Sequence, residues 1–457
     1  MRMGNILIKG GRVITMDAKA PDLERGDVLI DGDKIAAIAP TIDAPTGAEV
    51  IEAAGMIVIP GLVNAHLHTW QSEMRGIAGD WVVPQYMARM HRGMAPLFKP
   101  EDIHIANLMG ALTNLNSGVT TLVDWCHNNP TPMHTDAAID GLEQSGIRAV
   151  FLHGSPKPDA RPGEIHFSYR PMPRAEIERL LKGRLSAKDG QITLGLAILG
   201  PSYSVWEVTL EDMRLARDLD LQVSMHTGGG APIVPDGFGR LAKEKLLSSK
   251  TNVVHANNFS DETLKLTLDQ GVQYTVTADV ELQMGFGDPL TGKLMRLGAP
   301  VSIGTDVEVT TRADMFGCMR VTLQTQRNLD NQETWRKTDA APLEISVTCR
   351  QALEWATLNG ARMIGQEHRI GSLAPGKQAD IVLVRADDLT IFPVHDPVSS
   401  LVTQAGVSNV DTVLIGGRLM KRNGKVTASD LAGKKAALRR SAERILSDFG
   451  MLGRQAM

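Results

Sequence analysis

The sequence predicts an α/β protein, a (β/α)8 TIM barrel with a small composite β-sandwich domain formed by both termini. Short apolar, β-branched runs alternate with helical periodicities between residues 58 and 370. There are eight such runs, as in a (β/α)8 barrel. Strand–turn–strand patterns precede and follow this region. The expected organisation is a β-sandwich from residues 1–57 and 371–429, a hydrolase barrel over 58–370 and a C-terminal helix over 430–457.

Composition limits the class of protein. The chain has 457 residues, 43% of them hydrophobic, which is enough for a large core and more than one structural unit. The net charge of -4 gives no reason to expect nucleic acid or an anionic membrane as partner. Three scattered cysteines predict no disulfide framework. We therefore expect a cytoplasmic protein that acts on a small molecule, with no membrane or nucleic-acid partner, and we also expect a homo-oligomer.

The two ends of the chain are predicted to share one β-structure. Asp31-Gly32 supplies a hairpin turn before the strand at Lys34–Ile38. Neither end contains enough strands for a well-covered sheet, so we expect the early strands to pair with strands near residues 381–384 and 412–420. Two unrelated β-caps are the alternative. The early strands are Asn5–Lys9, Arg12–Thr15, Asp27–Ile30 and Lys34–Ile38.

The central region supplies the barrel. A doubly wound open sheet is the competing fold, but no glycine-rich phosphate loop follows the first strand. The expected strands are Val58–Val63, Thr120–Asp124, Arg148–Leu152, Thr193–Ile198, Leu221–Met225, Thr251–Val254, Val272–Val276 and Val301–Ile303. The expected helices include Arg174–Leu181, Leu210–Leu219, Asp261–Asp269, Leu290–Leu297, Ala313–Asn328, Leu343–Leu358 and Asp430–Phe449.

Histidines close a disproportionate share of the predicted strands. His66 and His68 follow the first strand two residues apart, so their side chains share one face. Taken alone, this pair fits a solvated surface equally well. The carboxyl ends of all barrel strands meet at one rim, so residues that close other strands join the pair there. Those residues include His153, His226, His255 and Asp306.

This pattern predicts a metal site. We expect one divalent cation, bound by His66, His68, His226 and Asp306. Imidazole nitrogens and a carboxylate suit zinc best, with iron, manganese or cobalt as alternatives. Such an ion lowers the pKa of a bound water to about 7 and supplies hydroxide. Asp306 is also the expected general base, and His255 is expected to hydrogen-bond the water or to stabilise developing charge.

These motifs together resemble the amidohydrolase superfamily, in its aminohydrolase and triazine-hydrolase (chlorohydrolase-like) branch. The resemblance covers essentially the whole chain. It implies a (β/α)8 barrel with a composite β-sandwich, a mononuclear metal site and hydrolysis at a ring or amide carbon. It rests on Pro60-Gly61-Leu-Val-Asn-Ala-His66-Leu-His68, the Leu67–Gly76 extension, His226, His255, Gly304-Thr305-Asp306 and His395-Asp396-Pro397.

One departure from the branch bears on the reaction. Its deaminases carry a proton-shuttling Glu three residues after the strand-five histidine, where this chain has Gly229. Deamination needs the ring nitrogen protonated, so another acid would have to substitute. Glu281, which stands where the branch usually has Asn, is the first candidate and is counted among the catalytic residues. Glu308 and Glu73 are further options, and each of the three also fits a surface carboxylate.

Substrate contacts are expected from residues that follow strand ends. Trp70 and Trp125 suit stacking against a flat ring, although either also suits packing behind the pocket. The full set is Trp70, Gln71, Trp125, His127, His153 and Tyr203.

The expected activity is hydrolysis by metal-bound hydroxide of a C–N or C–X bond in a small N-heterocycle or cyclic amide. One alternative is an aminohydrolase that releases ammonia from a heterocyclic amine with a replacement acid. The other is a non-catalytic metal-binding scaffold, although the ligand set looks intact.

Overall fold

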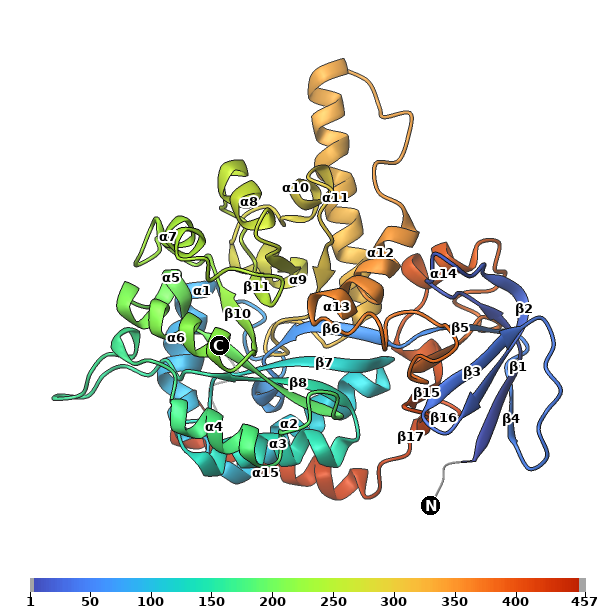
Figure 1. Ribbon diagram of the computed structural model, residues 1–457, viewed down its shortest axis with the longest axis horizontal. Coiled ribbons are helices and arrows are strands. Elements are labelled where there is room, and N and C mark those ends of the chain that lie inside the picture. The colour runs from blue at the N-terminus through green and yellow to red at the C-terminus, as the bar shows by residue number, and fades with distance from the viewer. Residues whose placement is uncertain (1–3, 452–457) are drawn as a thin grey trace.

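A computed structural model describes residues 4–451 of the chain, and two sheets organise it (Figure 1). The ends of the predicted terminal segments, residues 1–3 and 452–457, lie outside this range. The larger part is an eight-stranded parallel sheet whose strand order follows the chain, from β6 to β13. The predicted (β/α)8 barrel is therefore confirmed. Its strands are β6 (Leu62–Leu67), β7 (Val119–Cys126), β8 (Arg148–Gly154), β9 (Ile192–Ile198), β10 (Gln222–His226), β11 (Thr251–Val254), β12 (Gln273–Val276) and β13 (Ser302–Ile303).

The barrel closes between its first and last strands through the residue that follows β13. Asp306 forms a parallel bridge with Leu67. Its N–H donates to the carbonyl of His66 at 2.9 Å, and its carbonyl accepts from the N–H of His68 at 2.8 Å. The backbone that closes the barrel thus also holds Asp306 against the two histidines of β6.

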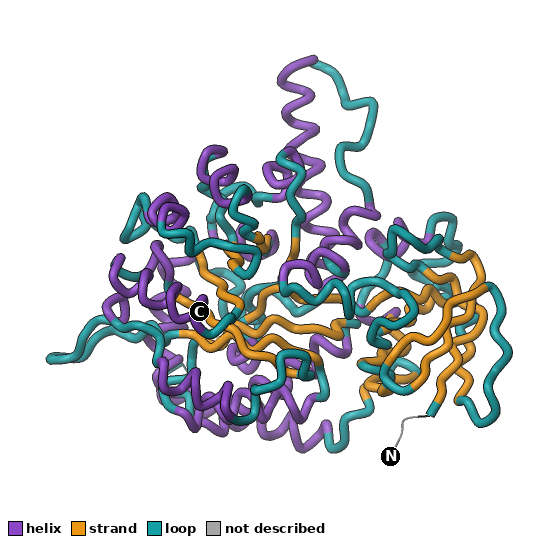
Figure 2. The backbone as a smooth tube through the Cα atoms, in the orientation of Figure 1, coloured by secondary structure: helices purple, strands orange, loops and turns teal. Residues whose placement is uncertain are grey.

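The second sheet contains strands from both ends of the chain, as predicted (Figure 2). Its order is β17-β16-β15-β14-β5-β1-β2-β3, with β4 paired to β1. The antiparallel pairing of β14 with β5 joins the C-terminal strands to the N-terminal ones. The bounds are β1 (Asn5–Val13), β2 (Leu23–Asp31), β3 (Lys34–Ala39), β4 (Glu49–Glu52), β5 (Met56–Pro60), β14 (Ile381–Arg385), β15 (Val410–Ile415), β16 (Arg418–Arg422) and β17 (Lys425–Val426).

The run expected to form one barrel strand, Val58–Val63, is divided between the two sheets. Its first part belongs to β5 of the terminal sheet, and the barrel strand β6 begins at Leu62. Gly61 lies at the break, and a Cβ added there would collide with the side chain of Thr120 on β7. Only glycine permits this close approach, because it has no Cβ.

Helices cover the outside of the barrel, and most of the expected ones are present. The range Leu343–Leu358 was wrong as one helix, because it divides into an exposed loop, α12 and the first residue of α13. The helix expected at Ala313–Asn328 continues to Thr338 as α11 and projects from the barrel (Figure 1). The longer helices are α2 (Pro100–Asn116), α3 (Pro132–Ser145), α4 (Arg174–Lys182), α6 (Trp206–Asp218), α8 (Asp261–Leu268), α11 (Met315–Thr338) and α15 (Leu431–Asp448). The shorter ones are α1 (Val83–Tyr86), α5 (Gly200–Tyr203), α7 (Gly237–Lys243), α9 (Ala278–Met284), α10 (Thr291–Arg296), α12 (Cys349–Trp355), α13 (Leu358–Met363) and α14 (Pro397–Thr403).

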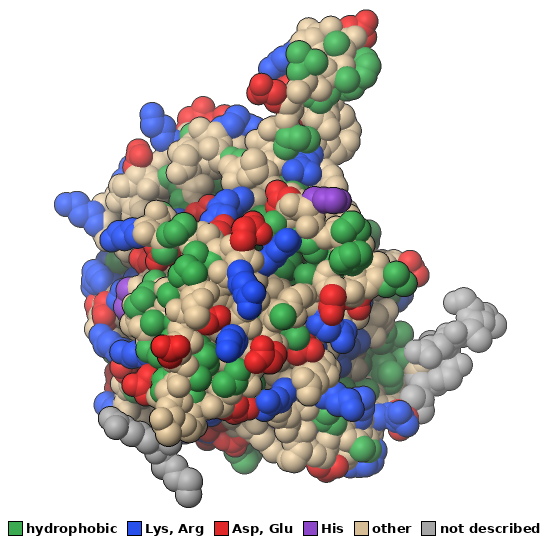
Figure 3. All heavy atoms as spheres, turned by 90° about the vertical axis from the view of Figure 1, so that its right-hand side faces the viewer, with side chains coloured by type: hydrophobic (Ala, Val, Ile, Leu, Met, Phe, Trp, Pro, Cys, Tyr) green, Lys and Arg blue, Asp and Glu red, His purple; other side chains and the backbone are tan. Residues whose placement is uncertain are grey.

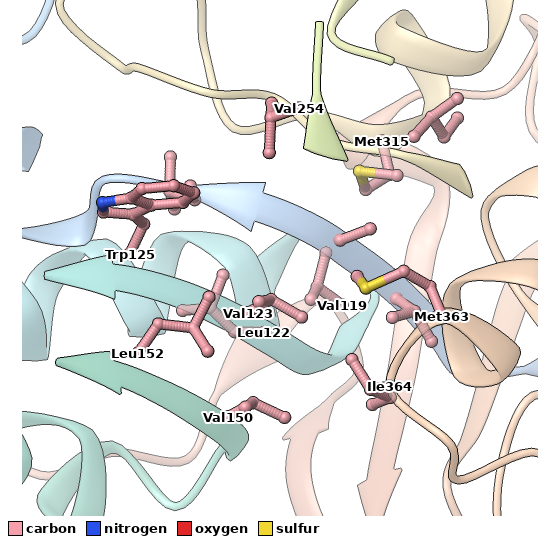
Figure 4. Close-up of a cluster of buried hydrophobic side chains, with 14 of the residues drawn as sticks. Val119, Leu122, Val123, Trp125, Val150, Leu152, Val254, Met315, Met363 and Ile364 are labelled. Carbon is pink, nitrogen blue, oxygen red and sulfur yellow. The ribbon is translucent and has the colours of Figure 1, made fainter. Parts of the chain in front are cut away.

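Apolar side chains fill the barrel interior (Figure 4). Trp125 lies at the carboxyl end of β7, while Met363 and Ile364 lie toward the opposite end. Val150 and Leu152 of β8 fill the space between them. Because the interior is packed, polar chemistry is confined to the rim at the carboxyl ends of the strands.

The surface carries mixed charge. Acidic and basic side chains are interspersed on the face shown in Figure 3, and apolar side chains lie on the projecting tip at its top. Near that tip, Trp335, Leu343 and Ile345 are exposed. Among residues 4–451, no helix has both the length and the apolar character needed to cross a membrane.

Candidate metal centre

Four predicted ligands converge at the carboxyl rim of the barrel. His66 and His68 come from β6, His226 ends β10, and Asp306 follows β13. One nitrogen or oxygen atom from each lies within 4.8 Å of the others, and all four residues are buried. These residues are separated by as much as 240 positions in the sequence, counted from His66 to Asp306, and the barrel brings them together.

The donor atoms point at one another. Asp306 Oδ1 lies 3.2 Å from His66 Nε2 and 3.4 Å from His68 Nε2. The His66 and His226 Nε2 atoms are 3.1 Å apart. The Trp125 carbonyl lies 2.9 Å from His68 Nδ1, so that nitrogen carries the proton and Nε2 keeps its lone pair toward the cluster. Facing lone pairs repel unless a cation lies between them, so the donor set fits one divalent metal.

The protonation states of the cluster also suit a metal. Burial lowers the pKa of His66 and His226 and lowers the pKa of His68 to about 3. Burial alone would raise the pKa of Asp306, but hydrogen bonding to His66 and the nearby histidines outweigh it and lower that pKa. Neutral imidazoles and an ionised carboxylate are the forms that bind metal, so the cluster is ready for an ion at neutral pH.

His255 and Glu281 form a second layer beside Asp306. His255 Nε2 lies 3.9 Å from Asp306 Oδ2, and its Nδ1 lies 3.2 Å from Glu281 Oε1. Glu281 is fully buried and also accepts hydrogen bonds from the Thr277 N–H at 2.9 Å and from Asn257 Nδ2 at 3.1 Å. Glu281 therefore lies behind His255, where it fixes the orientation of the imidazole.

The other two candidate acids are directed elsewhere. Glu308 accepts hydrogen bonds from Ser72 and from Arg75, whose Nε lies 3.0 Å away. Glu73 is buried beside Asp102 of α2 and Arg444 of α15, and this burial raises its pKa well above the usual value. Neither carboxylate takes the place of the glutamate that Gly229 replaces.

Aromatic and polar side chains predicted to line the pocket surround the ligands. The His127 ring stacks on His68 with 4.3 Å between ring centres, and Trp70 Nε1 donates to His127 Nδ1 at 2.9 Å. The Trp125 ring lies 3.8 Å from that of His226. Gln71 Nε2 donates to the Tyr86 hydroxyl at 2.7 Å. The structure thus brings Trp70, Gln71, Trp125 and His127 together around the metal ligands.

His153 and Tyr203 lie in different surroundings. His153 is buried between β8 and α3, with Nε2 3.4 Å from the Thr135 hydroxyl, so it is directed away from the ligands. Tyr203 donates from Oη to the carbonyl of Gly228 at 2.7 Å. It thereby supports the glycine loop that follows His226.

The loop Gly228–Gly230 has a backbone that favours glycine. Its φ angles are +96°, +77° and +155°. A Cβ at Gly229 would lie 3.2 Å from Tyr203 Oη and 3.4 Å from Val83 Cγ1. A cavity of about 470 Å³ lies beside this loop, between residues 201–239 and 258–266. Gly229 therefore carries no side chain where the branch's deaminases place a carboxylate, and a larger residue there would press against Tyr203 and Val83.

Sequence reasoning missed three residues near the ligands. Tyr86 and His91 come from the excursion before α2, with His91 Nε2 3.1 Å from Tyr86 Oη and the His91 ring 4.5 Å from that of His127. Neither residue follows a strand, so a search of the residues after each predicted strand could not find them. Lys157 lies in the β8–α4 loop, and its only sequence signal was a lysine between two prolines.

A parallel (β/α)8 barrel with an imidazole–carboxylate cluster at its carboxyl rim defines the metal-dependent barrel hydrolases as a class. The model of the Amidohydrolase family matches residues 57–420, and the chain belongs to that family. The predicted resemblance is therefore confirmed, and the chain is an amidohydrolase-superfamily hydrolase.

Similar proteins cover nearly the whole chain. The 5-methylthioadenosine/S-adenosylhomocysteine deaminase of Moorella thermoacetica is 26% identical over 441 residues, 94% of this chain and 96% of the relative. The 5'-deoxyadenosine deaminase of Methanothermobacter thermautotrophicus is also 26% identical, covering 92% and 94%. A zinc-bound adenosine deaminase from Xanthomonas campestris superposes with a TM-score of 0.82 at 24% identity, covering 97% and 99%. A zinc-complexed atrazine chlorohydrolase from Arthrobacter aurescens gives 0.84 at 23% identity, covering 96% and 100%.

Proposed function

We propose that this protein is a zinc-dependent hydrolase that cleaves a C–N or C–X bond in a small N-heterocycle or cyclic amide. The observation that carries the proposal is the buried convergence of His66, His68, His226 and Asp306. Zinc suits three imidazoles and one carboxylate, and zinc is named with two of the similar structures. Iron and manganese are alternative ions for the same donors.

The two oxygens of Asp306 have different neighbours, which supports two roles. A bound divalent ion supplies acidification of a water and polarisation of the scissile group. Oδ1 faces His66 and His68 and is the proposed ligand atom, while Oδ2 faces His255. We assign to Oδ2 the proton of the attacking water, because a carboxylate oxygen that does not itself bind the ion can act as general base.

His255 is the proposed donor to the charge that develops on the attacked group. Glu281 lies next to Nδ1 and fixes the direction of the ring, so that Nε2 points toward Asp306 and the substrate. Glu281 acts through His255 and is a positioning residue in this proposal. His255 and Glu281 are already buried at the metal centre, so this mechanism needs no additional acid.

The pocket wall supports a flat, ring-shaped substrate. We propose contacts from Trp70, Gln71, Trp125 and His127, which surround the ligands, and from Tyr203 beside the glycine loop. His153 faces α3 instead, so we assign it no substrate contact.

Two proposals concern the whole protein. A cytoplasmic location is supported by the free thiols Cys126, Cys318 and Cys349. A homo-oligomer is supported by apolar side chains exposed near the tip of α11, which a second copy would cover.

Deamination is the second candidate function, because the curated relatives are deaminases of adenine-containing compounds. Gly229 stands where the branch's deaminases have the proton-shuttling Glu, and the side chains of Glu73 and Glu308 are directed away from the metal centre. A deaminase would therefore depend on His255 and Glu281 for the proton given to the ring nitrogen or the leaving amine.

A product assay on zinc-loaded protein separates these candidates. The panel holds aminopyrimidines, chloro- and methylthio-triazines, and cyclic amides such as hydantoins, with ammonia, released chloride or thiol, and ring opening measured in parallel. We expect ring opening or C–X cleavage to exceed ammonia release by about tenfold or more, because no carboxylic acid lies where the deaminase glutamate would be. Ammonia as the dominant product would favour the deaminase, and no product from any class would favour the scaffold.

A further inference from the structure

Lys157 is a buried lysine on the metal-centre side of the β8–α4 loop. It retains 8% of its exposure, while the loop beyond it, residues 159–164, is exposed. Pro156 precedes it and Pro158 follows it. Proline fixes its own φ and restricts the residue before it, so this segment holds the lysine in one direction.

The ammonium group lies over the aromatic ring of Tyr203, near the loop that follows His226. Its Nζ is 4.6 Å from the centre of the Tyr203 ring, and Tyr203 is bonded in turn to the glycine loop after His226. Tyr203 thus places the lysine beside the loop that follows the ligand His226.

No acceptor satisfies this cation. Among residues 4–451, no carboxylate or carbonyl oxygen forms a hydrogen bond or ion pair with Lys157 Nζ. Burying an ammonium without a partner is unfavourable, and the Tyr203 ring offsets only part of that cost. Burial accordingly lowers the pKa of Lys157 to about 8, which still leaves it mainly charged at neutral pH.

The negative charge of Asp306 partly offsets the effect of burial on the pKa of Lys157. Two carboxylates lie at the metal centre: Asp306, which is one of the four ligands, and Glu281. His255 lies between them. A divalent ion balances these two negative charges, and Lys157 then remains the uncompensated cation. A substrate group of opposite charge would supply the missing partner.

We propose that Lys157 binds a negatively charged oxygen group of the substrate, either a carboxylate on the heterocycle or a deprotonated ring oxygen. This inference rests on the proposed hydrolase function and narrows its substrate class to anionic heterocycles. The ammonium anchors one end of the substrate beside Tyr203, so the scissile bond lies toward Asp306 and His255. Lys157 is thus a specificity-determining residue.

Binding of matched compounds to zinc-loaded protein tests the inference without turnover. One pair is orotate and its carboxamide, for the carboxylate. The other is barbiturate, which is anionic at neutral pH, and uracil, which is neutral, for the ring oxygen. Isothermal titration should show at least one anion binding about 10- to 100-fold more tightly than its neutral partner, as expected for a charged hydrogen bond. Lys157→Met and Lys157→Gln should abolish that preference, and Lys157→Arg should keep part of it.

The matched control is Lys182→Met on α4, an exposed lysine paired with Glu178, which should change nothing. Zinc content equal to that of the parent protein shows that each variant is folded and loaded. The inference is wrong if neither anion is preferred, if the preference survives in Lys157→Met, or if that variant weakens anion and neutral partner equally. The proposed function fails on a different result, the absence of turnover by zinc-loaded parent protein across both the substrate panel and anionic heterocycles.

Discussion

Asp306 combines structural and chemical tasks in one residue. Its backbone closes the barrel against His66 and His68, and its side chain meets the same histidines. The residue has a positive φ of +59°, which is uncommon for a non-glycine residue. Such strain persists where the surrounding structure imposes it, and here the bridge to Leu67 does so.

Replacing Asp306 by Asn separates its ligand role from its role as base. We expect turnover to fall by about 10²–10⁴-fold, because an amide cannot accept the water proton. Zinc should be retained better than in His226→Ala, since an amide oxygen still offers a ligand atom. Steady-state rates and zinc content, measured on the same preparation, check this. A variant with near-parental rates would show that Asp306 is not the base.

The sequence could predict the site residues that follow the ends of strands, but not those that come from other segments of the chain. His66, His68, His226 and Asp306 were found because barrel topology fixes where strand ends meet. His91, Tyr86 and Lys157 come from a helical excursion and a loop, whose paths depend on tertiary packing. The search of strand ends also included His153, which the alternation of β8 directs toward α3.

At the scale of elements, the division between β5 and β6 sets where the barrel begins. Gly61 stands between them, with Thr120 of β7 packed against its backbone. The chain passes from the terminal sheet into the barrel only because the two backbones approach closely here. The ligands His66 and His68 follow within the same β6 segment.

Gly61→Ala tests this constraint. The added methyl group collides with Thr120, so we expect about 1–3 kcal/mol of destabilisation and weaker zinc retention. Urea denaturation measures the free energy of unfolding. Gly239→Ala is the matched control, since a Cβ at this helical position meets nothing within 4 Å and should be neutral or stabilising. Equal stability of both variants would refute the role given to Gly61.

The one wrong helix prediction has a clear physical cause. The range Leu343–Leu358 looked helical because its apolar residues recur at helical spacing, yet Leu343 is fully exposed and Ile345 is 58% exposed. A helix begins only at Cys349, where the Thr348 side chain caps it by accepting from the Gln351 N–H. Periodicity predicts helix where it reflects burial, and here it does not.

At the scale of the whole molecule, the two ends of the chain and the barrel are tied together. Arg148 of β8 donates from Nε to Asp380 at 3.0 Å and from Nη2 at 3.1 Å, with both side chains buried. Asp380 also accepts from the Gly416 N–H at 2.7 Å. This network joins the barrel to β14 and β15 of the terminal sheet.

It was predictable that both ends of the chain form one structure, because neither end had enough strands to cover a sheet. The order of the strands in that sheet was not predictable. The pairing of β5 with β14 joins Ile59 to Val382, and local patterns do not encode such distant partners. Barrel order was easier to predict, since consecutive parallel strands usually lie side by side.

The most direct test of the central claim counts divalent ions bound per chain. After zinc loading and gel filtration, elemental analysis should find about one zinc per chain in the parent protein and in the control His368→Ala, whose histidine is exposed. His226→Ala should lose zinc and turnover together, because it removes one of four converging ligands. A parent protein without bound zinc, or a His226→Ala variant that retains the full equivalent, would contradict the account.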